Sequence, residues 1–209
     1  GISFGGLRGP ALMSMVPEVD RGVLWVGGSS FTQQIERSTH YITFEMLFAE
    51  SIAYPSRNDR GIMIATMQSI WDSLDAETFL PYHENGIEGL IQPFQMLYIT
   101  SMNDFQVSTL SCDRAVRTAG IQNLESSPWH PWGVDLTSGP IEGSGVVYFD
   151  GDFPEVPVGN LAGSLDYHSH AHGQIRGVPE AYNMGFEYLD SGIIIDTCND
   201  SCTFEGVWD

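Results

Sequence analysis

The sequence contains no lysine. All eight basic residues are arginines, against 27 acidic residues, and the formal net charge is −19. A nucleic-acid surface needs clustered basic side chains that displace counterions from phosphates, and docking on anionic lipid needs them too. The composition therefore argues against both partners. Such acidity is typical of a well-solvated surface, and no Asp-x-Asp-x-Asp loop points to calcium.

Long apolar runs are also missing. The longest runs, such as residues 146–149 and 192–195, are strand-sized, whereas a membrane helix needs about 20 apolar residues. We expect no stable membrane insertion. The chain opens at Gly1 without a signal peptide, in what reads as the middle of a motif. We therefore expect a missing N-terminal segment of the same protein, and the lack of a leader does not argue against export.

Cysteine is scarce, with three residues. Cys198 and Cys202 stand close together in a polar stretch, so a small disulfide is one reading and two free thiols the other. Tandem Cys-x-x-Cys pairs of a zinc site are absent. Cys112 is expected to be a small buried residue. A disulfide implies an oxidising compartment, so a secreted, periplasmic or cell-surface location is expected.

Short apolar runs alternate with helical patterns along the rest of the chain, which predicts an α/β fold. The expected strands cover residues 22–27, 94–100, 145–149 and 193–195. The expected helices cover residues 7–15, 111–118 and 180–189, with Gly120 ending the second and Pro179 in the first turn of the third.

Residues 29–94 differ in character, being rich in Met, Phe and Ile at helical spacing. One apolar face is predicted from Phe44, Leu47, Phe48 and Ile52, and another from Ile64, Met67, Ile70 and Trp71. Pro55 and Pro81 divide the stretch into about three helices. We predict a helical cap at 29–94, inserted into a core formed by 1–28 and 95–209.

The first residues, Gly1-Ile2-Ser3-Phe4-Gly5, match Gly-x-Ser-x-Gly. In this motif the serine sits on a sharp strand-to-helix turn that exposes its hydroxyl. Glycines on either side let the backbone pass closely. Ser3 is thus the candidate nucleophile, and the Phe4 N–H is the candidate oxyanion donor. The motif is weak alone, but a helical run and an apolar strand follow it directly.

An acid and a base follow in the order Ser, Asp, His. Asp104 comes just after an expected strand, where a triad acid belongs in an open α/β sheet; Asp113 is a weaker rival. His168, His170 and His172 are the candidate bases. We choose His172, because it precedes a loop and a closing helix, and keep His170 in reserve.

These pieces together resemble the C-terminal part of an α/β-hydrolase, in particular a bacterial esterase or lipase-like branch with a helical cap. The resemblance is carried by residues 1–6 with the following helix, 23–28, 98–107 and 172–189. It implies ester hydrolysis through Ser3, Asp104 and His172, without a cofactor, on a small-molecule ester or lipid. Two departures stand out. The strands before the Ser turn and the loop with a second oxyanion donor are absent, and 121–165 is longer than the family needs.

Other readings remain open. On a strand, Asp166, His168, His170 and His172 would face one side, and such imidazoles can bind zinc, giving a metal-dependent hydrolase or a metal-binding module. A peptidase on the same fold and a non-catalytic binding domain are further alternatives. The apolar cap residues suggest an acyl or alkyl pocket, although they could equally pack the cap onto the core. By itself, the chain is expected to be inactive.

Overall fold

The structure is a computed structural model that describes residues 1–49 and 54–207. For residues 47–49 the backbone is described and the side chains are not. A five-stranded sheet forms its centre, in the order β1-β2-β6-β3-β4, and neighbouring strands are parallel. The strands are β1 (Arg21–Trp25), β2 (Gln95–Ser101), β3 (Gln122–Leu124), β4 (Leu136–Thr137) and β6 (Gly145–Phe149). Each strand predicted at 22–27, 94–100 and 145–149 is present within a residue or two.

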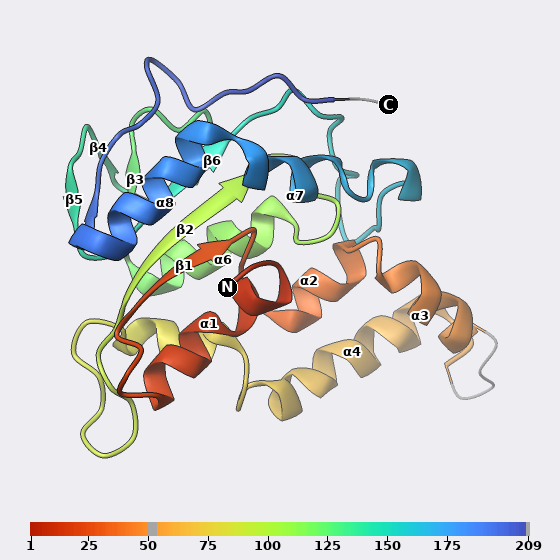
Figure 1. The fold of residues 1–209 in the computed structure, drawn as a ribbon. Helices are drawn as coiled ribbons and strands as arrows, with labels where there is room; N and C mark the ends of the chain where they lie inside the picture. Colours follow the sequence, from red (N-terminus) through yellow and green to blue (C-terminus); the bar gives the residue numbers. More distant parts are fainter. Residues whose placement is uncertain (50–53, 208–209) are drawn as a thin grey trace.

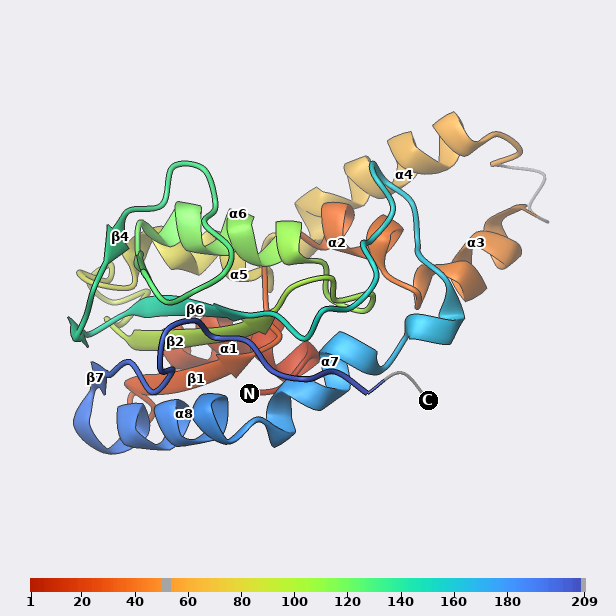
Figure 2. The same cartoon turned by 90° about the horizontal axis from the view of Figure 1, so that it is seen from above.

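Both faces of the sheet are covered by helices (Figures 1 and 2). Along β2, Met96 and Tyr98 join the core on one face, while Leu97 and Ile99 join the core on the other. The first face packs against α1 (Phe4–Met15), α5 (Ala76–Phe79) and α6 (Thr109–Ala119), and the second against α8 (Pro179–Ser191). This is an α/β fold with parallel strands buried on both sides.

Helix boundaries follow the sequence signals. Gly120 and Gly192 end α6 and α8 in the left-handed conformation, and Pro179 is the first residue of α8. Before α8 lie η2 (Leu165–Tyr167), α7 (His170–Gln174) and η3 (Ile175–Gly177), and after it β7 (Ile193–Ile194) pairs antiparallel with β5 (Ile141–Glu142).

The stretch predicted as a cap has two parts with different packing. Helices α2 (Phe31–Arg37), α3 (Tyr41–Ala49) and α4 (Arg57–Trp71) extend beyond the sheet in Figure 2. By contrast, α5 and η1 (Leu80–Tyr82) pack into the core through Ala76, Phe79 and Leu80. The helices that extend beyond the sheet therefore end at Trp71. Residues from Ala76 onward, which were predicted to be part of the cap, pack in the core instead.

The apolar face predicted for α4 is only partly buried. Ile64 is 2% exposed, but Ile70 is 70% exposed, so the residues predicted to form one apolar face differ widely in burial. Helix α4 packs on α2, and its Arg60 forms an ion pair with Glu45 of α3; these contacts leave Ile70, near its C-terminal end, exposed. On α3, Phe44 is 46% exposed. Ile52 and the side chains of Leu47 and Phe48 lie outside the described residues.

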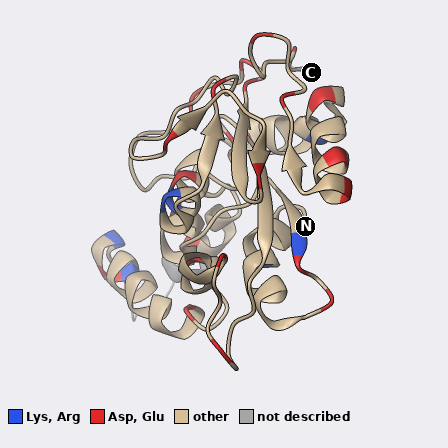
Figure 3. Ribbon diagram, turned by 90° about the vertical axis from the view of Figure 1, so that its left-hand side faces the viewer, with Lys and Arg blue, Asp and Glu red and all other residues tan. Residues whose placement is uncertain are grey.

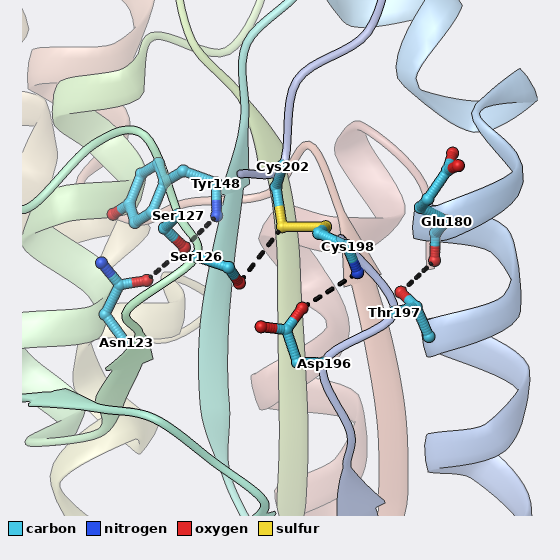
Figure 4. Close-up of a disulfide and its surroundings, with 9 residues drawn as sticks. All are labelled: Asn123, Ser126, Ser127, Tyr148, Glu180, Asp196, Thr197, Cys198 and Cys202. Atoms are coloured by element: carbon cyan, nitrogen blue, oxygen red, sulfur yellow. Dashed lines mark hydrogen bonds between the residues drawn. A yellow bond between two sulfur atoms is a disulfide. The ribbon is translucent and has the colours of Figure 1, made fainter. Parts of the chain in front are cut away.

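The two C-terminal cysteines form a disulfide, which decides between the two readings left open by the sequence. Figure 4 shows it close to the strands of the sheet, with the Ser126 hydroxyl 3.4 Å from the Cys202 sulfur. The Asp196 carboxylate accepts from the Cys198 amide. Both cysteines belong to the core on the α8 side, so the bond fastens the C-terminal tail there. Cys112 is free and buried, as predicted.

The start of α1 lies against the end of β1, and the contact depends on Gly6. A Cβ at this position would lie 2.7 Å from the Trp25 carbonyl oxygen and 2.9 Å from the Gly27 Cα. Both are backbone atoms, which cannot rotate away. Gly5 stands beside it in the same helix, yet a Cβ there would meet no atom within 4 Å.

We expect Gly6→Ala to lower the free energy of unfolding by about 1–3 kcal/mol, the usual effect of overpacking. Gly5→Ala is the matched control, and it should be neutral or slightly stabilising, because alanine favours helix over glycine by up to ~1 kcal/mol. Urea unfolding followed by circular dichroism measures both. Equal stabilities of the two variants would contradict this account of the contact.

Candidate active site

Ser3 lies at a strand-to-helix turn. Ile2 bridges to Trp25 in parallel, the Ser3 amide donates to the Trp25 carbonyl at 2.9 Å, and α1 begins at Phe4. The Ser3 backbone has φ 56° and ψ −117°, a conformation that costs a residue with a side chain about 1–3 kcal/mol. Strain of this kind in a turn that presents a hydroxyl is typical of a nucleophile.

The two glycines around Ser3 have different roles. A Cβ on Gly1 would lie 2.3 Å from the Gly5 carbonyl oxygen, so the turn excludes a side chain there. The sequence predicted that both glycines are needed because the backbone passes closely at each. This is confirmed for Gly1 and wrong for Gly5, where a side chain would have open space. Gly6, outside the motif, is the second residue at which the backbones meet closely.

The register of the sheet places Ser3 and Asp104 at the same edge. Ile2 is aligned with Trp25, Trp25 with Ile99, and Ile99 with Val147. Ser3 follows directly after this row. Strand β2 is the neighbour of β1 in the sheet, and Asp104 comes shortly after the end of β2. Because the strands are parallel, both residues lie beyond their carboxyl ends, where open α/β sheets bind ligands.

Asp104 and His172 form a buried pair. The His172 Nδ1 lies 2.6 Å from the Asp104 Oδ2, with the residues 5% and 1% exposed. The Asp104 Oδ1 accepts from the amides of Gln106 and Val107, at 2.7 and 3.1 Å. An ionised carboxylate accepts only, so Nδ1 carries the proton, and in the neutral ring Nε2 is left as a base.

The other candidates have different surroundings. His170, the reserve base, contacts the rings of Phe153 and Tyr167. Asp113, the rival acid, accepts from Trp129 Nε1 and from the Tyr148 hydroxyl at 2.9 Å. Burial raises the pKa of Asp113, and these two donors act against the rise. The structure thus pairs His172 with Asp104 and gives Asp113 other partners.

Ser3 is not hydrogen-bonded to His172. Among the described residues, the Ser3 hydroxyl has no hydrogen-bond partner. Ile2 and Gly5, on either side of Ser3 and Phe4, line an apolar groove together with Arg176 of η3, the short helix after α7. Catalytic hydrogen bonds are often long or unformed without substrate. The structure therefore contains the Asp104–His172 bond of the predicted triad, and Ser3 lies at the same edge of the sheet without a hydrogen bond to either residue.

The groove itself runs along β1, between α1 and α8, and has a volume of about 550 Å³. Apolar side chains from both helices line it, and several are half exposed, including Leu12, Phe186 and Leu189. Within the groove the Gly1 ammonium donates to the Val23 carbonyl at 2.7 Å, and burial lowers the pKa of this amino group. In the described residues, Gly1 to Ser3 pair with Val23 to Trp25 on the outer edge of β1.

A polar cluster beside the pair was not predicted from the sequence. The Thr39 hydroxyl lies 2.6 Å from His168 Nδ1, and the His40 ring meets the His168 ring edge-on at 4.9 Å. Burial lowers the pKa of His168, the positive charges of His40 and His172 lower it further, and Asp104 opposes them. No sequence signal reveals this cluster, because Thr39 and His168 are 129 residues apart.

The geometry does not support the metal reading of the histidines. His168 caps η2, whereas His170 and His172 belong to α7, so the strand that would align them is absent from this described segment. In residues 1–49 and 54–207, one group of three possible ligands lies together: Asp196, Cys198 and Cys202. Its two sulfurs are joined in the disulfide and cannot act as thiolate ligands. The acidic residues are instead spread over loops, helices and strands (Figure 3).

Comparison with known proteins finds no relative. The chain matches no family model, no curated protein and no solved structure. None of the helices that the structure describes combines the length and the hydropathy of a membrane span. The candidate site is therefore defined by the geometry of its own residues.

The lowered pKa of His168 predicts a dependence of stability on pH. The unfolded chain, in which the ring has its ordinary pKa of about 6.5, takes up the proton before the folded chain does. Neutral His168 thus contributes stability that is full above pH ~6.5 and is lost as the pH falls below it. His168→Gln should make the urea midpoint less sensitive to pH between 7.5 and 5. Parallel curves for the variant and the wild type would refute this.

Proposed function

We propose that this protein is a serine hydrolase that cleaves carboxylic esters, with Ser3 as nucleophile, His172 as base and Asp104 as the residue that orients the base. The observation that carries the proposal is the buried Asp104–His172 hydrogen bond, at the same sheet edge as the strained Ser3 turn. A buried carboxylate that fixes the imidazole tautomer is the arrangement that activates a serine.

In the proposed reaction, His172 Nε2 takes the proton of the Ser3 hydroxyl while the oxygen attacks the ester carbonyl. The tetrahedral oxyanion accepts from the Phe4 amide, which lies in the first turn of α1 and has no intrahelical acceptor. The intermediate collapses, the alcohol leaves with the proton from His172, and an acyl-enzyme remains. Water then attacks the acyl carbon while His172 takes its proton, and when this second intermediate collapses His172 returns the proton to the Ser3 oxygen, which releases the acid and the free serine.

Aromatic side chains beside Ser3 support an apolar substrate. Phe4 is 59% exposed, and its ring meets Phe31 edge-on at 6.3 Å. Phe31 in turn contacts Trp71 at 5.8 Å. Arg8 lies over both phenylalanine rings, at 5.1 Å from each. We propose that this surface faces the acyl or alkyl group of the ester, and that α2, α3 and α4 act as a cap over it.

The disulfide supports a proposed location outside the reducing cytosol. Cys198 and Cys202 are bonded to each other, and such bonds persist in oxidising compartments. We therefore keep secretion, the periplasm or the cell surface as the proposed location.

The groove along β1 supports the proposal that a further strand completes the enzyme. Gly1 to Ser3 already pair parallel to Val23–Trp25. Residues preceding Gly1 would continue this ladder beside Arg21 and Gly22, between the apolar faces of α1 and α8. A strand there would be buried on both faces, like its neighbours. We propose that this segment comes from the same protein and that turnover requires it.

The test is covalent labelling. A polypeptide that extends the chain upstream of Gly1 should react with a fluorophosphonate probe at Ser3. Ser3→Ala should abolish labelling, and Asp104→Asn should slow it by roughly 10⁴-fold, because the imidazole then adopts the wrong tautomer. Ser69→Ala, at an exposed serine of α4, is the matched control and should react normally. No labelling at Ser3, or labelling that survives Ser3→Ala, would end the proposal.

A further inference from the structure

Gln106 uses each of its polar groups to bind a different part of the site. Its amide donates to Asp104 Oδ1 at 2.7 Å, and its carbonyl accepts from the side-chain amide of Gln34. Its side-chain Nε2 donates to the His168 carbonyl at 2.8 Å, and Oε1 lies 3.1 Å from His40 Nε2. Few side chains outside a core have both their donor group and their acceptor group bound to protein partners in this way.

The directions of these bonds are fixed by chemistry. A carbonyl only accepts, so the group facing the His168 oxygen must be the NH₂ of Gln106. Oε1 then faces His40 and accepts from it, which places a proton on His40 Nε2. Gln106 thus has one orientation that satisfies both partners.

The partners belong to three separate segments. Asp104 lies in the loop after β2, and His168 directly precedes the short helix that carries His172. Gln34 is on α2, and His40 lies between α2 and α3. Two further contacts join the same segments: Thr39 donates to the Phe105 carbonyl, and Gln34 Oε1 accepts from the Ser108 amide at 3.0 Å. Gln106 stands at the centre of these contacts.

We propose that Gln106 is a positioning residue: it holds the loop of Asp104 and the segment of His172 at the distance at which they bond, and couples both to α2 and α3. Its catalytic meaning rests on the proposed function, whereas its effect on the Asp104–His172 bond does not. The charged and titratable groups around it are Asp104, His172, His168 and His40.

Gln106→Glu tests this with almost no change in shape. The carboxylate retains an acceptor for His40, loses the donor to the His168 carbonyl, and adds a negative charge near Asp104. Gln106→Ala removes both side-chain bonds. Gln95→Glu is the matched control, because Gln95 is exposed at the opposite end of β2 and accepts from Arg21.

The first measurement uses the 209-residue chain and needs no activity. Proton NMR follows the downfield signal of the His172 Nδ1 proton, and ¹⁵N shifts report the ring tautomer. Both Gln106 variants should raise the exchange rate of this proton by up to about tenfold, the upper end of the effect of one lost hydrogen bond, while Gln95→Glu leaves it unchanged. An unchanged signal in folded Gln106→Glu would overturn the proposal.

His40→Ala provides a second test in case the Gln106 variants do not fold. It removes the outermost partner and leaves the bonds of Gln106 to Asp104 and His168 in place, so a smaller increase in exchange, in the same direction, is expected. No increase would overturn the coupling to α2 and α3. In the active, extended protein, Gln106→Glu should lower kcat with KM unchanged. If Ser3 is never labelled but the NMR changes appear, the proposed function fails and the positioning role stands.

Discussion

The hydrogen bond between Asp104 and His172 is the interaction on which the rest of the site depends. Burying a carboxylate is costly unless its oxygens are satisfied, and here one oxygen accepts two backbone amides and the other the imidazole. The amides come from the turn that follows β2, so the end of a buried central strand fixes the acid. The base, 68 residues later, is brought to it by the segment between β6 and α8.

The strained Ser3 turn is maintained by the same sheet. Ile2 and Ser3 pair with the end of β1, and α1 approaches β1 so closely that Gly6 and Gly27 are in backbone contact. Moving Ser3 to a relaxed conformation would disturb this contact and the burial of α1 on the sheet. The strain is therefore offset by packing that extends well beyond the turn, and the hydroxyl is held at the edge where Asp104 also lies.

Local signals predicted the core well, because burial on both faces leaves a recognisable apolar run, as at residues 94–100 and 145–149, and because Gly120 marks a helix end. The pairing of Asp104 with His172 was also foreseeable, because Asp104 follows a strand end and His172 precedes a loop and a closing helix. The residues that surround this pair could not be predicted from the sequence. Thr39, His40 and Gln106 are ordinary surface residue types, and their role arises from contacts across the fold. The exposure of Ile70 and the packing of Ala76 in the core likewise depend on which elements lie next to each helix. The periodicity of apolar residues does not predict those neighbours.

Beyond the aromatic contact of Phe31 with Phe4, the contacts described between α2–α4 and the loops of the core are mostly polar, which has a physical consequence. Thr39, Gln34 and His40 meet the loop of Asp104 through hydrogen bonds, and Asn160 binds Arg57 and Glu36 on the far side. Each such bond contributes about 0.5–1.5 kcal/mol net, whereas the sheet core is held by extensive apolar burial. Separating these helices from the core would therefore break fewer apolar contacts than opening the sheet would. Because the same bonds position Asp104 and the segment of His172, such a separation would loosen the pair while the sheet beneath it stays folded.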